Sequence, residues 1–183
     1  GTYLAPSQAR LLPEVLASAL AGLDLGGGDY ALSPLPDRER SVALALGATE
    51  LSTDELSKFL SSHLTVGAHP PDWLTHDVLD ALGRSALPDK TLASLPLLTD
   101  GAGLLVQPSK ATRTSSTWAQ LYASLRAYVS TSAYNALPQS LRQRFRLLEF
   151  DSNQIARDCA DPLLYPRLIE REHLLLQALM SLE

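Results

Sequence analysis

Several features are scarce in this chain of 183 residues, and each scarcity excludes a class of protein. A single cysteine, Cys159, excludes an internal disulfide framework and fits a reducing compartment. No apolar run approaches the roughly 20 residues that a membrane-spanning helix needs. No charged N-terminal region followed by an apolar core marks a signal peptide. The sequence therefore predicts a protein that does not enter a membrane, and we expect it in the cytoplasm.

Acidic residues are missing from the stretch Gly101 to Leu148, although the whole chain has a net charge of −5. Residues 1–100 hold 13 acids and six bases, whereas residues 149–183 hold seven acids and three bases. This acidic, basic, acidic pattern matters because partners sense the local field more than the total charge. The bases predicted to bind an acidic or anionic partner are Lys110, Arg113, Arg126, Arg142, Arg144 and Arg146.

The composition and periodicity of the chain predict a helical globular domain. Hydrophobic residues make up 45% of it, which is ordinary for a globular protein and too high for a disordered one. The length favours one domain over residues 1–183, with a soft boundary in the polar loop 108–117. Apolar residues at three- and four-residue steps predict an all-α (mainly) bundle of about seven helices. One short β-hairpin near 95–107, turning at Asp100-Gly101, is the predicted exception.

Three stretches define the helical prediction best. Ser52 and Glu55 form a capping box, which predicts that a helix begins at Thr53. This helix is predicted to end at Leu64. Ser116 to Leu137 is the longest amphipathic pattern, and its mild outer face predicts a central helix. A basic helix, 138–150, follows it. The last helix runs from near Pro166 to Leu182, and Glu172 falls within its apolar stripe, so an arginine from 126–146 is the expected partner of that carboxylate. Further helices are predicted at 8–23, 34–48, 72–84 and 151–159.

Residues 75–106 also fit the element order of a winged helix-turn-helix. In that alternative, 75–82 is the first helix, 90–95 the recognition helix and 99–107 the wing. The connection before Thr91 is longer than a tight turn, and Pro96 would end the recognition helix after about two turns. Lys90 is its only base, whereas DNA binding depends on neutralising phosphates.

Smaller groupings have simpler explanations than a functional site. Asp72, His76 and Asp80 share one helix face, but a rise of about 1.5 Å per residue prevents one metal ion from reaching all three. Gly26 to Gly28 lack the spacing of a phosphate-binding loop and fit a linker. Cys159 lies between acids that raise a thiol pKa, so we interpret it as structural. We therefore predict no metal and no cofactor, and no motif of a known active site is present.

Several interpretations of the basic segment stay open. The first is a non-enzymatic helical interaction or assembly module that docks an acidic protein surface or another copy of itself. The second is binding of RNA or single-stranded nucleic acid, with Tyr122, Tyr128 or Tyr134 stacking on bases. The third is neutralisation of the bases inside the molecule by the acidic flanks. An enzyme whose site is assembled only in three dimensions is a further alternative, although the sequence favours a non-enzyme.

Overall fold

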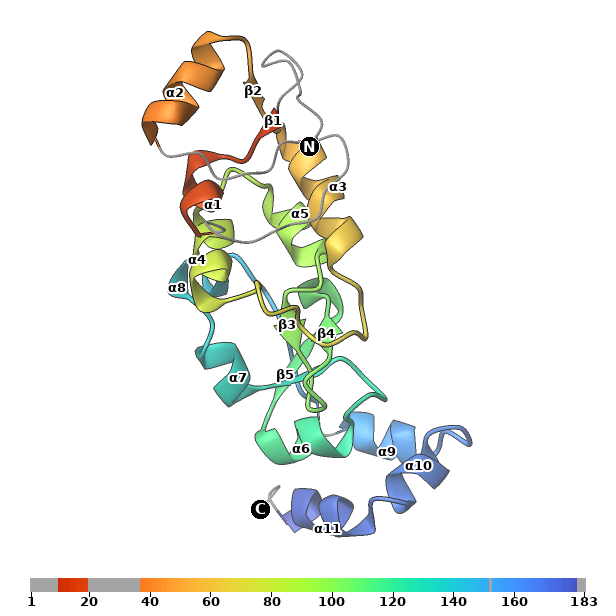
Figure 1. Cartoon of the computed structure of the whole chain (residues 1–183). Helices are drawn as coiled ribbons and strands as arrows, with labels where there is room; N and C mark the ends of the chain where they lie inside the picture. Colours follow the sequence, from red (N-terminus) through yellow and green to blue (C-terminus); the bar gives the residue numbers. More distant parts are fainter. Residues whose placement is uncertain (1–9, 20–36, 152, 181–183) are drawn as a thin grey trace.

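The computed structural model describes residues 10–19, 37–151 and 153–180, and the statements below concern these residues. They form an elongated molecule with α2 (Asp37–Ala45) near one end and α10 (Tyr165–Ile169) and α11 (Glu172–Met180) at the other (Figure 1). Eleven α-helices and three small sheets make up this part of the chain. The mainly helical prediction is confirmed, but these helices are shorter and more numerous than a bundle of about seven. None of the described helices combines the length and apolar character that a bilayer crossing requires.

The N-terminal half is assembled around a helix whose start the sequence predicts correctly. Strand β1 (Arg10–Leu11) pairs in parallel with β2 (Thr49–Glu50), and α1 (Glu14–Ala19) follows β1. Helix α3 (Thr53–His63) begins at the capping box: Ser52 Oγ accepts from Glu55 N at 3.3 Å, and Glu55 Oε2 accepts from Ser52 N at 2.9 Å. Residues 20–36, with Gly26 to Gly28 and part of the predicted helix 8–23, lie outside the described residues.

The centre of the molecule contains two helices followed by a hairpin. Helix α4 (His76–Arg84) is followed by α5 (Asp89–Ser94), and β3 (Leu98–Thr99) pairs in antiparallel fashion with β4 (Leu105–Val106). The predicted hairpin is confirmed with shorter strands. This is the element order of the winged helix-turn-helix alternative, but Lys90 is the only base of α5.

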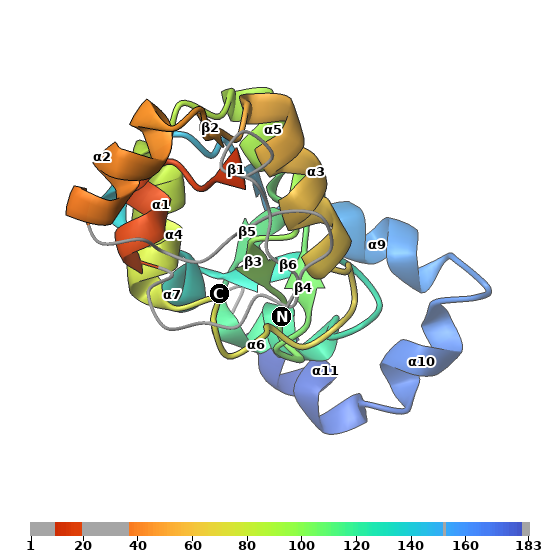
Figure 2. The same ribbon diagram turned by 45° about the horizontal axis from the view of Figure 1, so that its top comes forward.

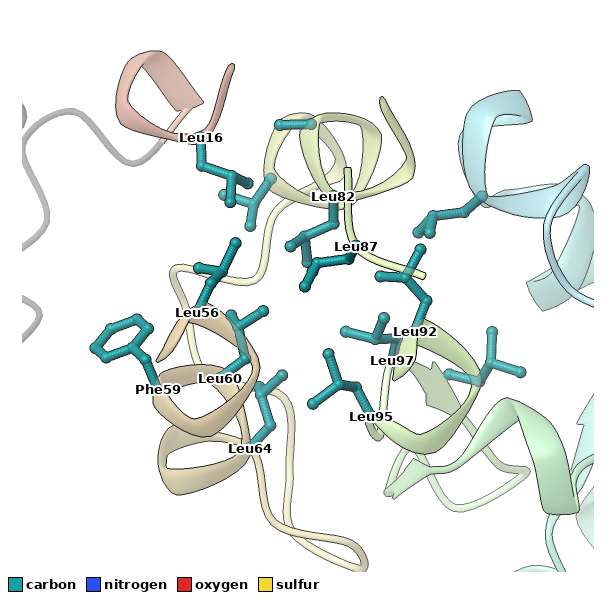
Figure 3. Packing of buried hydrophobic residues seen from close by; sticks show 14 of the residues in the cluster. Leu16, Leu56, Phe59, Leu60, Leu64, Leu82, Leu87, Leu92, Leu95 and Leu97 are labelled. Atoms are coloured by element: carbon teal, nitrogen blue, oxygen red, sulfur yellow. The ribbon is translucent and has the colours of Figure 1, made fainter. Parts of the chain in front are cut away.

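Leucine side chains from four helices fill the core of this half (Figure 3). Leu16 of α1, Leu56 and Leu60 of α3, Leu82 of α4 and Leu92 of α5 are each at most 2% exposed. Burying such a side chain stabilises the fold by roughly 1.5–3 kcal/mol. This core therefore fixes α4 and α5, the helices against which the basic segment packs.

The predicted helix from Ser116 to Leu137 is wrong, because the structure divides it into three elements. Helix α6 (Ser116–Leu121) ends in a turn where Ser124 adopts a φ of +63°, and strand β6 (Tyr128–Ser130) and helix α7 (Thr131–Asn135) follow. A contact from outside the segment holds this turn: Asp100 Oδ2 accepts from Ser124 N at 3.2 Å, while Asp100 Oδ1 accepts from Ala102 N and Leu104 N in the hairpin loop. One buried carboxylate thus holds two turns together.

Strand β6 belongs to a parallel sheet that no periodicity in the sequence indicates. The sheet has the order β6-β5-β7, with β5 (Thr112–Thr114) between β6 and β7 (Leu148–Glu149). The predicted basic helix 138–150 is consequently cut short: it forms α8 (Gln139–Arg142), after which the chain extends into β7.

The C-terminal region forms a second, smaller core. Helices α9 (Asn153–Cys159), α10 and α11 extend from the rest of the molecule (Figure 2). The buried members of this cluster come from α6, β6 and the three C-terminal helices: Trp118, Leu121, Tyr122, Tyr128, Ile155, Leu168 and Ala178. The predicted last helix, 166–182, is divided into α10 and α11.

Candidate functional site

Arg113 is paired within the molecule by the register of the parallel sheet. It lies opposite Glu149 in the β5–β7 ladder, and its Nε and Nη2 donate to Glu149 Oε2 at 3.4 Å and Oε1 at 2.5 Å. Its guanidinium also lies 5.4 Å from the centre of the Tyr134 ring, within the range of a cation–π contact. Arg113 is therefore held by β7 through Glu149 and by α7 through Tyr134.

Arg126 forms the most buried ion pair of the segment. Its Nε donates to Asp158 Oδ2 at 3.2 Å, and its Nη2 donates to Asp158 Oδ1, which also accepts from Gln154 Nε2 at 2.7 Å. The Asp158 side chain is 2% exposed. The hydrogen bonds to Asp158 raise the pKa of the Arg126 guanidinium, while partial burial opposes them. This bidentate pair joins α9 to the chain just before β6.

Arg144 binds the backbone of the segment that connects α4 to α5. Its Nη1 donates to the carbonyl oxygens of Gly83 at 3.0 Å and Ser85 at 3.1 Å, and its Nη2 donates to that of Leu87. Its Nε donates to Asp89 Oδ1 at 2.6 Å. Carbonyls that follow the last turn of a helix lack intrahelical partners, and one guanidinium supplies several donors. Arg144 therefore has a structural role.

The other three bases have no such partner. No carboxylate of the described residues forms an ion pair with Lys110, Arg142 or Arg146. Lys110 and Arg146 are exposed, whereas Arg142 is half-buried and its Nε has no hydrogen-bond partner. Thr112 pairs with Leu148 at the start of the parallel strands β5 and β7, and Lys110 and Arg146 each precede their strand by two residues, so both lie toward the same end of the sheet. Internal neutralisation thus accounts for half of the bases.

The tyrosines are not free surface groups. Tyr122 is 0% and Tyr128 5% exposed, with ring centres 4.7 Å apart. Tyr134 is half-buried, and its hydroxyl donates to the Arg142 carbonyl at 3.0 Å. Burial raises the pKa of Tyr122 and Tyr128, and the nearby Asp158 charge raises both further. The Tyr122 hydroxyl is buried near Asp158, whose oxygens accept from Arg126 and Gln154, but it forms no hydrogen bond of normal geometry.

The remaining candidate residues are also placed by the structure. Asp80 accepts from Ser140 Oγ at 2.7 Å and pairs with Arg84, and no group of three or more potential metal ligands occurs within residues 10–19, 37–151 and 153–180. Cys159 is half-buried against the C-terminal cluster. Glu172 is exposed, so the expectation that an arginine must neutralise it inside the core is wrong.

Sequence reasoning missed the residue that does hold α11 in place. Arg171 Nη1 donates to the carbonyl oxygens of Leu121 at 2.7 Å and Ala123 at 3.0 Å, at the end of α6. Its position directly before Glu172 carries no distinguishing sequence signal. A charged side chain within a predicted surface helix usually faces solvent.

The structure also contains a small apolar pocket of about 110 Å³. Side chains from α4, the hairpin and the β6–α7 segment line it, among them Leu79, Leu98, Leu105, Val129, Ala133 and Leu137. Its lining includes no titratable side chain.

Comparisons of the chain with known protein families, with curated proteins and with solved structures found no match.

Proposed function

We propose that this protein is a non-enzymatic helical interaction module that docks an acidic surface of a protein partner through Lys110, Arg142 and Arg146. The observation that carries the proposal is the contrast within the basic segment. Three of its arginines bind carboxylates of the same chain, and these three residues do not, as far as the chain is described. Two of the three, Lys110 and Arg146, are exposed, and each precedes a strand of the same parallel sheet by two residues.

Charge complementarity of this kind guides encounter more than it fixes affinity. Exposed lysine and arginine side chains accelerate association with an acidic surface, and salt weakens the effect because the Debye length is about 8 Å at physiological ionic strength. We therefore expect a partner that associates rapidly and in a salt-sensitive manner. Carboxylates of the partner would neutralise the three unpaired bases, as carboxylates of this chain neutralise Arg113, Arg126 and Arg144.

Nucleic-acid binding through the same bases has less support. Stacking on a base requires an accessible aromatic face, but Tyr122 and Tyr128 are buried and Tyr134 faces Arg113. Three unpaired bases would also give a weak salt dependence for a single strand, with a logarithmic slope of at most about 2. An acidic protein surface needs neither stacking nor a long row of phosphate contacts.

Charge reversal tests the proposal. Binding of a labelled oligoglutamate peptide and of a labelled oligothymidylate is measured by fluorescence anisotropy at low salt. We expect the double variant Lys110→Glu/Arg146→Glu to lose at least about tenfold in peptide affinity. The matched control is Arg38→Glu/Lys58→Glu, which reverses two exposed bases outside the segment.

Three results would contradict the proposal. The control could lose as much affinity as the test variant, which would assign binding to net charge. The wild-type protein could fail to bind the peptide at all. It could also bind the oligonucleotide in preference to the peptide, which would support the nucleic-acid alternative instead.

A further inference from the structure

Large apolar side chains are exposed on the two helices at the C-terminal end of the structure. Leu163 is 81% and Met180 78% exposed, and four further side chains on α10 and α11 are at least 42% exposed: Tyr165, Ile169, Leu176 and Leu179. Single exposed apolar residues are ordinary, but six so close together, five on two contacting helices and Leu163 just before the first of them, are not. We call these six residues the C-terminal apolar surface.

The orientation of α11 is fixed, so its outer face is well defined. Ala178 is completely buried, and Leu174 and Leu175 pack against the same cluster. Arg171 holds the start of the helix against α6. Helical periodicity then places Glu172, Leu176 and Met180 in one row on the opposite side, because residues four apart lie above one another.

The size and charge of this surface fit a second copy of the same chain. At 42% to 81% exposure, the six side chains together leave on the order of several hundred Å² open to solvent, as much as the largest apolar patch of a typical monomer and the same order as the roughly 800 Å² that each partner contributes to a standard interface. The exposed charged residues around them have both signs, with Arg167 opposed by Glu170 and Glu172. None of these three forms an ion pair within the described part of the chain.

We infer that the C-terminal apolar surface is the interface of a symmetric homodimer. A two-fold contact brings the same patch from both copies together, so a surface with an apolar centre and both charges around it is complementary to itself. A uniformly acidic or uniformly basic partner would meet charges of its own sign there as well as charges of the opposite sign. This interface is made of residues different from Lys110, Arg142 and Arg146, and it goes beyond the proposed docking of an acidic partner.

The oligomeric state of the purified chain tests the inference. Light scattering coupled to gel filtration should give a mass that rises from 19.8 kDa toward twice that value with concentration. The variant Leu176→Ser/Met180→Ser should remain monomeric, and circular dichroism should show that it stays folded, since both side chains are exposed. The matched control is Leu46→Ser, which removes an exposed leucine after α2, near the other end of the molecule, and should dimerise like the wild type.

Cross-linking then tests the symmetry of the contact. In a Cys159→Ser background, Leu176→Cys should form covalent dimers with a short bifunctional thiol reagent, because a two-fold axis near α11 brings both copies of this residue together. Leu46→Cys should not. A wild-type protein that is monomeric at every concentration would overturn the inference. So would a Leu176→Ser/Met180→Ser variant that dimerises as strongly as the wild type. Dissociation by Leu46→Ser would overturn the symmetric arrangement in favour of head-to-tail contact. None of these outcomes depends on whether oligoglutamate binds at Lys110 and Arg146.

Discussion

At the scale of single residues, Arg144 and Arg146 have the same side chain two positions apart and opposite surroundings. Arg144 donates to three carbonyl oxygens and to Asp89, whereas Arg146 is exposed and unpaired within the described residues. We expect Arg144→Ala to lower the free energy of unfolding by about 2–4 kcal/mol, because several partly buried acceptors lose their donor. Arg146→Ala should change it by less than about 0.5 kcal/mol. Urea denaturation measures both, and equal losses would remove the structural role assigned to Arg144.

Tyr122 supports a second prediction at this scale. Its hydroxyl is buried without a hydrogen bond, so Tyr122→Phe should raise the free energy of unfolding by about 1 kcal/mol at neutral pH. Burial also raises the Tyr122 pKa above the ordinary value of 10.0. Above pH 10 the unfolded tyrosine loses its proton first, so stability falls as pH rises. The advantage of Tyr122→Phe should therefore grow above pH 10.

Denaturant titrations of wild type and Tyr122→Phe across the alkaline range check both parts of this prediction. Tyr134→Phe serves as a control, because its hydroxyl donates to Arg142 and its loss should destabilise the fold. A destabilised Tyr122→Phe protein at neutral pH would show that the Tyr122 hydroxyl has a partner after all.

At the scale of elements, a structure that depends on residues close in sequence can be predicted, whereas one that depends on contacts between distant residues cannot. The α3 capping box depends on two residues three positions apart, and the hairpin at Asp100 depends on one turn, so both follow from the sequence. The break in the predicted helix 116–137 does not. Trp118, Leu121, Leu125 and Val129 keep helical spacing, whereas the contacts that hold the turn come from distant residues. Asp100, 24 residues before Ser124, accepts from the Ser124 backbone, and Arg171 donates to carbonyl oxygens of the same turn.

The same limit applies to the candidate site. Six bases could be located from sequence, but the pairing of three of them depends on carboxylates 36, 32 and 55 residues away. These carboxylates lie outside the acid-free stretch and reach it through sheet register and helix packing. Which bases stay unpaired therefore follows from the fold and could not have been read from charge pattern alone.

Replacing Ser124 distinguishes the turn from the predicted helix. In a helix, alanine is more favourable than serine and serine more favourable than glycine, over a range of about 1 kcal/mol. At a φ of +63° the order reverses, because glycine avoids a left-handed strain of roughly 1–2 kcal/mol. We expect Ser124→Gly to be at least as stable as the wild type and Ser124→Ala to be no more stable. Thermal denaturation gives the order, and a most stable alanine variant would restore the continuous helix.

At the scale of the whole molecule, two apolar clusters meet at β6, where Val129 belongs to the larger cluster and Tyr128 to the smaller one. The larger cluster extends from α1, α3, α4 and α5 through the hairpin to β6 and α8, and the smaller one lies among α6, β6 and the C-terminal helices. Within the smaller cluster, Asp158 ties α9 to Arg126, and Arg171 ties the start of α11 to the end of α6. The C-terminal helices thus depend on a small set of contacts, which makes their separate loosening testable.

Asp158→Ala should loosen the C-terminal helices while leaving the larger cluster folded. The substitution deprives Arg126 of a buried counter-charge, and we expect a loss of about 2–4 kcal/mol, less than for a fully buried pair because Arg126 is 35% exposed. Hydrogen exchange should rise in α9 to α11 and β6 but stay slow in α3 and α4, since regions with separate cores open separately. The matched control is Glu149→Ala, which breaks the exposed pair with Arg113 and should cost at most about 1 kcal/mol. Uniformly faster exchange after Asp158→Ala would mean that both clusters unfold as one unit.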